Sequence, residues 1–533
     1  MMYMKQVETK LPLLATMLAT VLLTMSLSLP ALADARLAMA AKERDLDSVR
    51  LLLAERGADV NALGPYATPA LHWIVRIEDH ELARRLLEAG ADPNLRTGLD
   101  VSALSIAIEN GDADMVQLLL RHKADVHQPD RTSETPLMQA ARTGSADIVR
   151  MLLAQGAKVD VREPQNQQTA LMIGVRSGSA GVVKLLLAAG ADVNVQSKIG
   201  EIPRFRLPSE SAASKGVGVN RGGWPERGQR APVGGAKTPL LYATRKGDLA
   251  ITQLLVAAGA NIEQTDANGV TPLLNTVLNA TVTSQPDHKT QHLDVAYYLI
   301  EHGANINASD WYGETPLWAA VDLRDLDVSG PTRDNGIDRA AAFTLIKTLL
   351  EHGADPNARI KELPPDHRWV TRLGSLSWVD FTEQTAFLRA ALSGDVSTMK
   401  LLVAHGADPN ITTFTGSTPL MAAAGVNWTV SQTYDEGADA LLEAVKLAHE
   451  LGNDVNAQNA LGFAAIHGAA NRGSDNIIRW LAANGARLDI ADKVGRTPVT
   501  WAHGVFLATH PPVDRPQTVA LLETLMASPT RDK

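Results

Sequence analysis

The chain has 533 residues, of which 45% are hydrophobic and 20% are charged, with ordinary amounts of glycine and proline. This composition excludes a disordered chain and a collagen-like chain. The formal net charge is -9, from 59 acidic and 50 basic residues. It argues against a general nucleic-acid binder, which needs a basic surface to contact phosphates.

The first 33 residues differ in composition from the rest of the chain. Lys5 and Lys10 precede an uncharged run from Leu11 to Leu29, and Ala31-Leu32-Ala33 has the small-x-small pattern that signal peptidase accepts. We predict a signal peptide, residues 1–33, cleaved after Ala33. The alternative is an uncleaved membrane anchor, because the run is close to spanning length. Hydroxyl side chains dilute the run and favour cleavage, and these are Thr16, Thr20, Thr24, Ser26 and Ser28.

The chain contains no cysteine. This excludes disulfides, thiolate nucleophiles and cysteine-ligated zinc. An exported chain without disulfides must be stable by packing alone, which suits a bacterial periplasm best. After signal cleavage no remaining stretch is expected to span a membrane, so the protein is expected to be periplasmic or secreted.

A helical pattern that recurs along the chain is best seen from Lys237 to Glu263, KTPLLYATRKGDLAITQLLVAAGANIE. Thr238 can cap a helix, and Pro239 suits the first helical position. Gly247 can end this helix in a left-handed turn. A second apolar stripe follows and closes at Gly259. The pattern therefore predicts two short helices joined by a glycine turn.

The threonine position of this pattern recurs with a dominant spacing of 33 residues. It falls at residues 69, 102, 135, 169, 238, 271, 315, 385, 418, 464 and 497. A degenerate copy from Ala35 to Asn61 precedes the first, which makes about twelve repeats. The period, the TPL opening and the GADVN closing resemble the ankyrin repeat. The resemblance extends to about Ala527 and implies an all-α solenoid of helix-turn-helix repeats with short turn or hairpin loops, in which each repeat buries its apolar face against the next.

Several repeats depart from the Thr-Pro-Leu-His opening of the family. Lys123 also stands where other repeats end their second helix with glycine. These departures leave the local geometry of the turns undetermined, but they do not change the expected fold. The departing openings are Pro69-Ala70-Leu71-His72, Ser102-Ala103-Leu104-Ser105 and Ala464-Ala465-Ile466-His467.

Two long loop insertions, residues 197–237 and 361–384, separate three blocks of repeats, 34–196, 238–360 and 385–533, the last with a cap. The first insertion has eight basic and three acidic side chains between Lys198 and Lys237. Its Gly, Pro and Ser content predicts flexibility. The second is enriched in aromatic residues. Smaller insertions are expected near residues 281–291, 325–338 and 427–439.

The two long insertions can form a lid or a surface that recognises a partner, because Trp and Arg are frequent at binding hot spots. The alternative for the second insertion is that its aromatic side chains fold back into a small satellite core. The candidate contact residues are Arg204, Arg206, Arg221, Trp224 and Arg227 in the first insertion and Trp369, Trp378 and Phe381 in the second.

The resemblance also implies that a partner meets the turn tips and the C-terminal end of each first helix. Four of the first five residues at the seventh position after the threonine are arginines, and Lys246 follows Arg245. The residues at this position are Arg76, Glu109, Arg142, Arg176, Arg245, Leu278 and Asp322. Regular stacking would align these residues along one groove, which favours an acidic partner contacted by arginine. The alternative is that each arginine only complements a helix dipole.

The histidines have explanations in the repeat pattern. His72 and His467 occupy the histidine position of the family, and His302, His352 and His405 precede the terminal glycine of a second helix. The sequence has no metalloprotease, nucleophile-elbow or calcium-loop motif. We therefore expect no catalytic residue, no metal site and no cofactor.

The leading hypothesis is an exported, non-enzymatic and monomeric scaffold for protein–protein interaction. It binds an unidentified protein along its concave face and turn tips and does not bind nucleic acid. Two alternatives stay open. One is an enzyme or enzyme-accessory protein whose inserted loops close a pocket over the middle of the array, and the other is a secreted effector that binds a host protein.

Overall fold

A computed structural model of the chain describes residues 35–55, 58–200, 234–280, 289–325, 338–361, 380–428, 436–505 and 512–527. It divides into two compact units, which we call unit 1 (Met1–Asp192) and unit 2 (Val193–Lys533). In the described residues the regular structure is helical, apart from two isolated β-bridges, Leu63 with Pro69 and Arg96 with Ser102. None of the described helices is long and apolar enough to cross a membrane.

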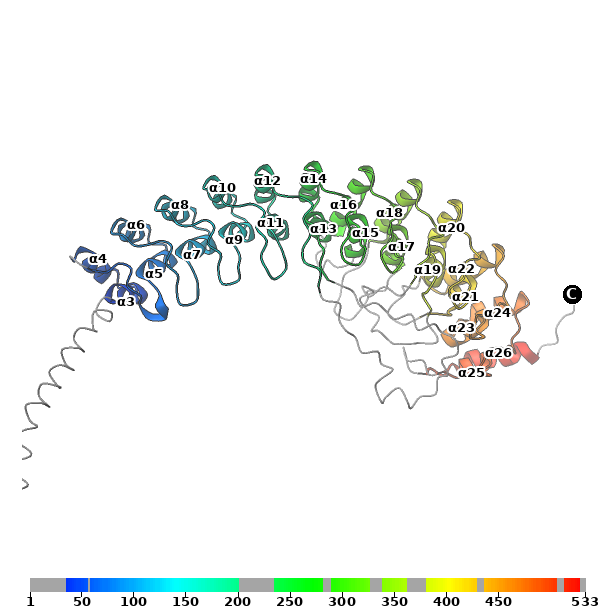
Figure 1. The fold of residues 1–533 in the computed structure, drawn as a ribbon. Coiled ribbons are helices and arrows are strands. Elements are labelled where there is room, and N and C mark those ends of the chain that lie inside the picture. The colour runs from blue at the N-terminus through cyan, green and yellow to red at the C-terminus, as the bar shows by residue number, and fades with distance from the viewer. Residues whose placement is uncertain are drawn as a thin grey trace, which may run out of the picture. The chain divides into compact units, whose positions relative to one another are not determined.

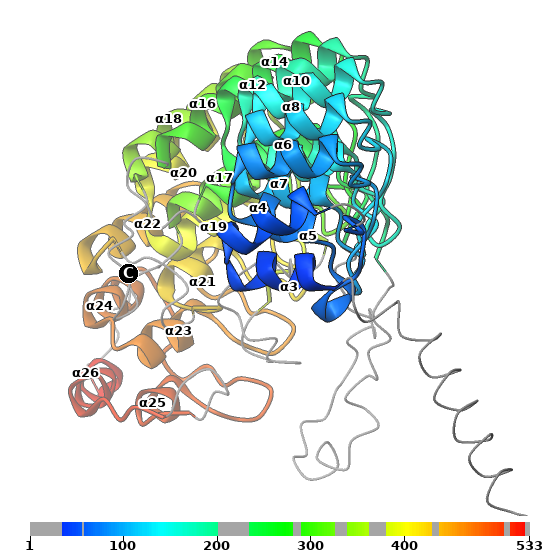
Figure 2. The ribbon, with the colours of Figure 1, turned by 90° about the vertical axis from the view of Figure 1, so that its left-hand side faces the viewer.

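The described residues of unit 1 form five helix pairs, each with a first or inner helix followed by a second or outer helix (Figure 1). Inner helices pack against neighbouring inner helices, and outer helices against outer ones, which gives the two layers seen in Figure 2. The inner helices are α3 (Arg36–Glu43), α5 (Ala70–Arg76), α7 (Ala103–Asn110), α9 (Pro136–Thr143) and α11 (Ala170–Ser177). The outer helices are α4 (Leu46–Ala54), α6 (His80–Glu88), α8 (Ala113–Arg121), α10 (Ala146–Ala154) and α12 (Ala180–Ala188); a 3-10 turn, η1, spans Pro65–Ala67.

Unit 2 has the same kind of arrangement, with seven helix pairs in its described parts, and its inner and outer helices again pack against neighbours of their own layer. The inner helices are α13 (Pro239–Lys246), α15 (Pro272–Asn279), α17 (Pro316–Asp325), α19 (Ala386–Ser393), α21 (Pro419–Ala424), α23 (Ala465–Arg472) and α25 (Pro498–Ala502). The outer helices are α14 (Leu249–Ala257), α16 (Lys289–Glu301), α18 (Arg339–Glu351), α20 (Val396–Ala404), α22 (Ala438–Glu450), α24 (Asp475–Ala483) and α26 (Pro516–Ala527). The all-helical repeat architecture expected from the sequence is confirmed.

The threonine position determines where each inner helix begins. At all eleven predicted positions an inner helix starts at the next residue. Thr238 accepts a hydrogen bond on its Oγ1 atom from the Leu241 backbone N–H at 3.1 Å, and Pro239 follows as the first helical residue. Ser102 caps α7 in the same way, whereas Ala464 has no capping oxygen. The repeat frame therefore persists where the motif is degenerate.

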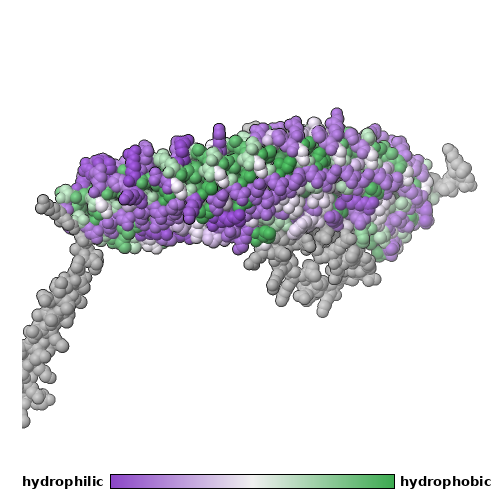
Figure 3. Space-filling model, turned by 45° about the horizontal axis from the view of Figure 1, so that its top comes forward, coloured by the Kyte–Doolittle hydropathy of each residue, from purple (hydrophilic) through white to green (hydrophobic). Residues whose placement is uncertain are grey.

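The core of each unit lies between its two layers of helices. In unit 1, Ala140 and Ala141 of the inner helix α9 are fully buried, and so are Ile148, Val149 and Leu152 of the outer helix α10. Small inner-helix residues let neighbouring inner helices approach closely, and larger outer-helix residues fill the space between the layers. On the side of the outer helices, hydrophobic residues lie among hydrophilic ones (Figure 3). Each helix pair thus buries its apolar stripe against its neighbours.

Lys123 preserves the turn that glycine makes in other repeats. Its φ angle is 66°, in the left-handed region, where Gly156 of the next repeat has a φ of 85°. This conformation costs a residue that carries a Cβ atom about 1–2 kcal/mol, and glycine avoids that cost. Lys123 therefore leaves the fold unchanged, but the backbone at this residue is strained.

The asparagine of the GADVN closing motif joins consecutive repeats. Asn357 donates from Nδ2 to the Gly406 carbonyl oxygen at 3.0 Å and accepts on Oδ1 from the Asp408 backbone N–H at 2.7 Å. The motif's amide group is thus a bridge between repeats. The same two bonds are made by Asn61 and Asn94 in unit 1 and by Asn194, Asn307 and Asn456 in unit 2.

Replacing Asn357 with alanine is expected to destabilise the protein by about 1–2 kcal/mol, because two solvent-accessible hydrogen bonds between repeats are lost. Asn357→Asp keeps the acceptor and loses only the donor, so its effect should be smaller. Urea unfolding followed by circular dichroism measures both variants. An alanine variant as stable as the unmodified protein would contradict the bridging role.

Candidate interaction surfaces

The predicted arginines of unit 1 lie at the C-terminal ends of inner helices. Arg76 ends α5, and Arg142 and Arg176 lie in the last turns of α9 and α11, all with exposed side chains. Arg142 Nη2 pairs with Glu134 Oε2 at 2.8 Å, and Arg176 Nη1 donates to Gln168 Oε1 at 2.9 Å. Both partners directly precede the threonine position of the same repeat. The two guanidinium groups are therefore held beside their own loops.

Arg245 and Lys246, the corresponding residues of unit 2, end α13 and are exposed. The basic pattern does not continue along unit 2. Leu278 occupies the next equivalent position, and Asp322 the one after that. In unit 1 the pattern is interrupted by the exposed Glu109 of α7. The basic side chains therefore gather mainly in unit 1, with one pair at the start of unit 2.

The loops that connect successive repeats carry exposed apolar side chains that the sequence analysis missed. In unit 1, Tyr66 is 71% exposed and Leu99 is 64% exposed. In unit 2, Trp311, Phe414 and Val494 are 45%, 40% and 78% exposed. Each lies three or four residues before a threonine position, where the repeats of Thr135 and Thr169 have only polar residues. An apolar residue at this position of the repeat was therefore the sequence signal for an exposed side chain in the loop.

In unit 2 these loops are joined to one another by backbone hydrogen bonds. Trp311 N–H donates to the Asn268 carbonyl oxygen at 3.0 Å, and Phe414 N–H donates to that of Thr382 at 2.8 Å. Equivalent bonds run from Ala267 to Gly235, Lys361 to Tyr312, Ala460 to Thr415 and Lys493 to Leu461. We call these loops the loop row, and it comprises Gly235–Lys237, Asp266–Val270, Asp310–Glu314, Ile360–Lys361 with Asp380–Gln384, Thr413–Ser417, Asn459–Phe463 and Asp492–Arg496.

Acidic or amide side chains fix the backbone within the loop row. Asp310 Oδ1 accepts hydrogen bonds from the backbone N–H groups of Tyr312 and Glu314, each at 2.9 Å. Asp492 binds the N–H groups of Val494 and Arg496 in the same way. Such local bonds hold tight turns in one conformation. The loop row is therefore organised before any partner arrives, which lowers the entropic cost of binding.

The predicted contact residue Phe381 lies in the loop row and is half-buried. Its neighbour Asp380 is buried, and Oδ2 of Asp380 accepts from the backbone N–H and the hydroxyl of Thr415 at 2.8 and 2.6 Å. Asn427 holds the Asp380 backbone through its side-chain amide. Phe381 is therefore presented from a fixed backbone. Seven other predicted contact residues lie outside the described residues: Arg204, Arg206, Arg221, Trp224, Arg227, Trp369 and Trp378.

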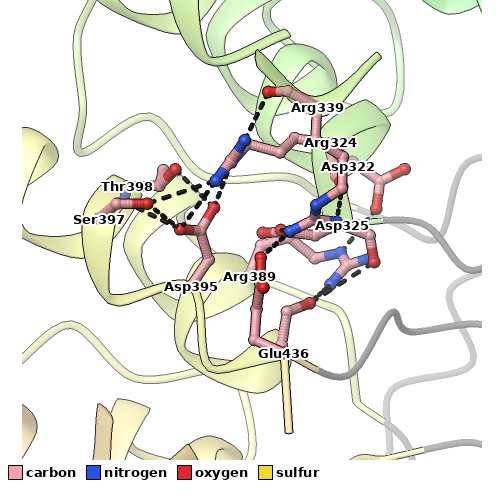
Figure 4. A network of polar contacts seen from close by, with 10 residues as sticks. Asp322, Arg324, Asp325, Arg339, Arg389, Asp395, Ser397, Thr398 and Glu436 are labelled. Carbon is pink, nitrogen blue, oxygen red and sulfur yellow. Dashed lines mark hydrogen bonds and ion pairs between the residues drawn. The ribbon is translucent and has the colours of Figure 1, made fainter. Parts of the chain in front are cut away.

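A buried polar network lies in unit 2 where α17, α18, α19 and α20 meet (Figure 4). Arg389 of α19 is 2% exposed, and its Nε atom pairs with Asp322 Oδ1 at 2.6 Å. Its Nη2 atom donates to the Asp325 backbone carbonyl oxygen at 2.8 Å. Arg324 of α17 pairs with Asp395, at 2.5 Å between Nε and Oδ2. Arginine side chains thus connect one repeat to the next.

Asp395 and Arg339 extend this network in two directions. Burial acts to raise the pKa of Asp395, but hydrogen bonds from Arg324, Ser397 and Thr398 outweigh burial and lower it. Arg339 pairs with Glu436, and the guanidinium groups of Arg324 and Arg339 donate to each other's backbone carbonyl oxygens. The network therefore extends over three successive repeats. The sequence signal for this network was an arginine, Arg389, at a position of the inner helix that faces the core.

The buried histidines take part in packing between repeats. His72 Nε2 lies 3.2 Å from the Val101 carbonyl oxygen, and burial lowers the pKa of His72 to about 4. His467 Nε2 lies 3.0 Å from the Ile490 carbonyl oxygen, and burial lowers its pKa as well. Among the described residues, no cluster of three or more His, Asp or Glu side chains could hold a metal ion.

The stacked helix pairs and their ordered loops define a solenoid that offers an extended contact surface in each unit. A family model described as ankyrin repeats (3 copies) matches residues 37–130, 104–197 and 240–329, and a second, described as ankyrin repeat, matches residues 382–414. The chain belongs to the ankyrin-repeat family. Its repeats therefore indicate a scaffold for protein–protein interaction.

Individual relatives are similar over limited regions. The chain is 46% identical over 65 residues to the inactive serine/threonine-protein kinase TEX14 of Bos taurus, which is 12% of this chain and 4% of that protein. It is similar to the solved ankyrin repeat domain of Bcl-3, with 21% identity, a TM-score of 0.35, and 47% of this chain and 92% of that chain covered. The human ASB11 ankyrin repeat domain gives 24% identity, a TM-score of 0.35, and coverage of 49% and 96%.

Proposed function

We propose that this protein is an exported, non-enzymatic scaffold that binds a partner protein through its inter-repeat loops and the adjoining ends of its inner helices. The observation that supports this proposal most strongly is the loop row of unit 2. Six backbone hydrogen bonds join its loops, and Trp311, Phe414 and Val494 project from it with large exposed fractions. Exposed aromatic side chains on a fixed backbone are favourable anchors for a protein partner.

The arginines of unit 1 support an acidic partner surface. Arg142 is about half exposed although it pairs with Glu134, and exposed ion pairs of this kind contribute little to stability. Its guanidinium group can therefore exchange Glu134 for a carboxylate of a partner at little cost. Arg76 and Arg176 occupy equivalent positions on α5 and α11. Arginine binds carboxylates in a planar, two-bond geometry, which favours an acidic protein surface.

The proposed destination is the periplasm or the outside of the cell, and it rests on the charged start, apolar run and Ala31-Leu32-Ala33 site of the sequence. We also propose that the protein acts as a monomer. The contact surfaces above need no catalytic group, metal or cofactor. Crosslinking in the native compartment, followed by mass spectrometry, would identify the partner and show whether that compartment is the cell envelope.

Replacing Arg76, Arg142 and Arg176 together with glutamate is expected to weaken capture of the crosslinked partner at least about tenfold. A tenfold change needs about 1.4 kcal/mol, and loss of a single arginine hot spot costs about 2 kcal/mol or more. The matched control replaces Arg121, Arg150 and Lys184 with glutamate, which gives the same charge change on exposed outer-helix positions of unit 1. Equal capture by both variants, with unchanged circular dichroism, would reject the proposed surface.

A further inference from the structure

The buried network of unit 2 contains three arginines and four acidic side chains. Each arginine has a close acidic partner: Arg389 pairs with Asp322, Arg324 with Asp395, and Arg339 with Glu436. The fourth acid is Asp325, the last residue of α17. With all seven groups ionised, the network would carry one negative charge in excess.

Among the described residues, no hydrogen bond stabilises a carboxylate at Asp325. The residue is fully buried, and neither carboxyl oxygen has a hydrogen-bond partner in the part of the chain that the structure describes. The nearest cationic atom is Arg339 Nη2, at 3.7 Å from Oδ1, beyond hydrogen-bond length, and Arg339 already serves Glu436. Asp325 also stands at the C-terminal end of a helix, where the backbone dipoles disfavour an anion.

We propose that the Asp325 carboxyl group is protonated in the folded protein, and that it completes a clamp across three successive repeats that loosens when this proton is lost. Protonation leaves three arginines opposite three carboxylates, so the buried charges balance. An ionised Asp325 would instead be a buried charge without a hydrogen-bonded partner, which is strongly unfavourable.

The clamp consists of the contacts that link Asp325, Arg389, Ser393 and Glu436, and it joins helices that are far apart in the sequence. The Asp325 backbone carbonyl accepts from Arg389 Nη2 of the next repeat and from Ser393 Oγ, at 2.8 and 3.5 Å. The backbone N–H of Glu436, which precedes α22, donates to the Ser393 carbonyl oxygen at 3.2 Å. A negative charge on Asp325 would therefore arise where three repeats are held together.

The charged groups that act on Asp325 are Arg324 of α17, Arg339 of α18, Arg389 of α19 and Asp395 at the start of α20. Asp322 of α17 and Glu436 before α22 belong to the same network as the ion-pair partners of Arg389 and Arg339. Burial raises the pKa of Asp325 well above its ordinary value of 3.8, the negative charge of Asp395 raises it further, and Arg389, Arg339 and Arg324 oppose the rise. Because this pKa is higher in the folded state, the stabilisation is complete below the unfolded pKa and is lost as pH rises through the folded pKa.

The test compares the full-length protein with Asp325→Asn, a neutral side chain of the same shape, by urea unfolding over a pH series. Relative to Asp325→Asn, the folding equilibrium constant of the unmodified protein should fall about tenfold for each pH unit between the unfolded and folded pKa values. A variant that is less stable than the unmodified protein by the same factor at every pH would overturn the proposal.

The control Asp395→Asn removes an acid that has a cationic partner, and it should destabilise the protein at neutral pH. If Asp395→Asn instead stabilises the protein as much as Asp325→Asn, removal of any acidic side chain from the network has the same effect, and the proposal fails. Infrared spectra of protein with isotopically labelled aspartate provide a readout that needs no variant. A protonated carboxyl band at neutral pH that disappears as pH rises is expected, and an absent band would overturn the proposal.

Discussion

Replacing Arg389 with methionine is expected to lower the free energy of unfolding of unit 2 by about 3–5 kcal/mol, the cost of removing one partner from a buried ion pair. Methionine fills much of the same volume, so the loss comes from the polar groups that remain. The nearly buried carboxylate of Asp322 would lose its ion pair with Arg389, and the Asp325 backbone carbonyl oxygen would lose the Arg389 donor at 2.8 Å. Urea unfolding gives the magnitude, and hydrogen exchange should show the earliest opening in α17 to α20.

Lys347→Met provides the matched control for Arg389→Met. Lys347 of α18 pairs with Glu351 at 3.7 Å, and both side chains are more than half exposed, so its removal should cost less than about 1 kcal/mol. Asp322→Asn combined with Arg389→Met should cost less than the sum of the two single changes, because the two residues contact each other. Equal losses for Arg389→Met and Lys347→Met would show that the network does not stabilise unit 2.

The helical frame could be predicted from the sequence because its signals are local. A helix start needs only a capping residue and a first turn, and Thr238 with Pro239 supplies both within one repeat. A left-handed turn needs only a residue that tolerates positive φ, and Gly247 has a φ of 68°. Because this local motif recurs along the chain, eleven inner-helix starts could be placed from its threonine position even where the spacing varied.

The contacts between repeats could not be predicted in the same way. Arg389 and Asp322 are 67 residues apart, and their pairing depends on which turn of α19 faces which turn of α17. The closing asparagine was recognised as a motif, but its bridge to the following repeat requires the position of that repeat. Exposed side chains such as Val494 were missed because an apolar residue in a sequence is first interpreted as core.

Close packing of backbones makes Gly468 of α23 a position where adding a single methyl group is expected to destabilise unit 2. An added Cβ atom would lie 2.6 Å from the Val426 backbone nitrogen and 2.8 Å from the Gly425 carbonyl carbon, distances that real Cβ atoms do not adopt. Backbone atoms cannot turn aside as side-chain ends can, so α23 would have to move away from the end of α21. Gly468→Ala is therefore expected to destabilise unit 2 by about 1–3 kcal/mol, measured by urea unfolding.

Gly181→Ala on α12 of unit 1 separates this steric effect from the helix propensity of alanine. The added Cβ atom at Gly181 would meet only the Ala146 Cβ atom, at the ordinary contact distance of 3.6 Å. Alanine is better than glycine inside a helix by up to about 1 kcal/mol, so this variant should be as stable as the unmodified protein or more stable. The two substitutions are chemically identical and should have opposite signs, because only Gly468 lies where two backbones touch. A Gly468→Ala variant that gains stability would mean that α21 and α23 can separate without loss, and that inner-helix packing in unit 2 is looser than these distances indicate.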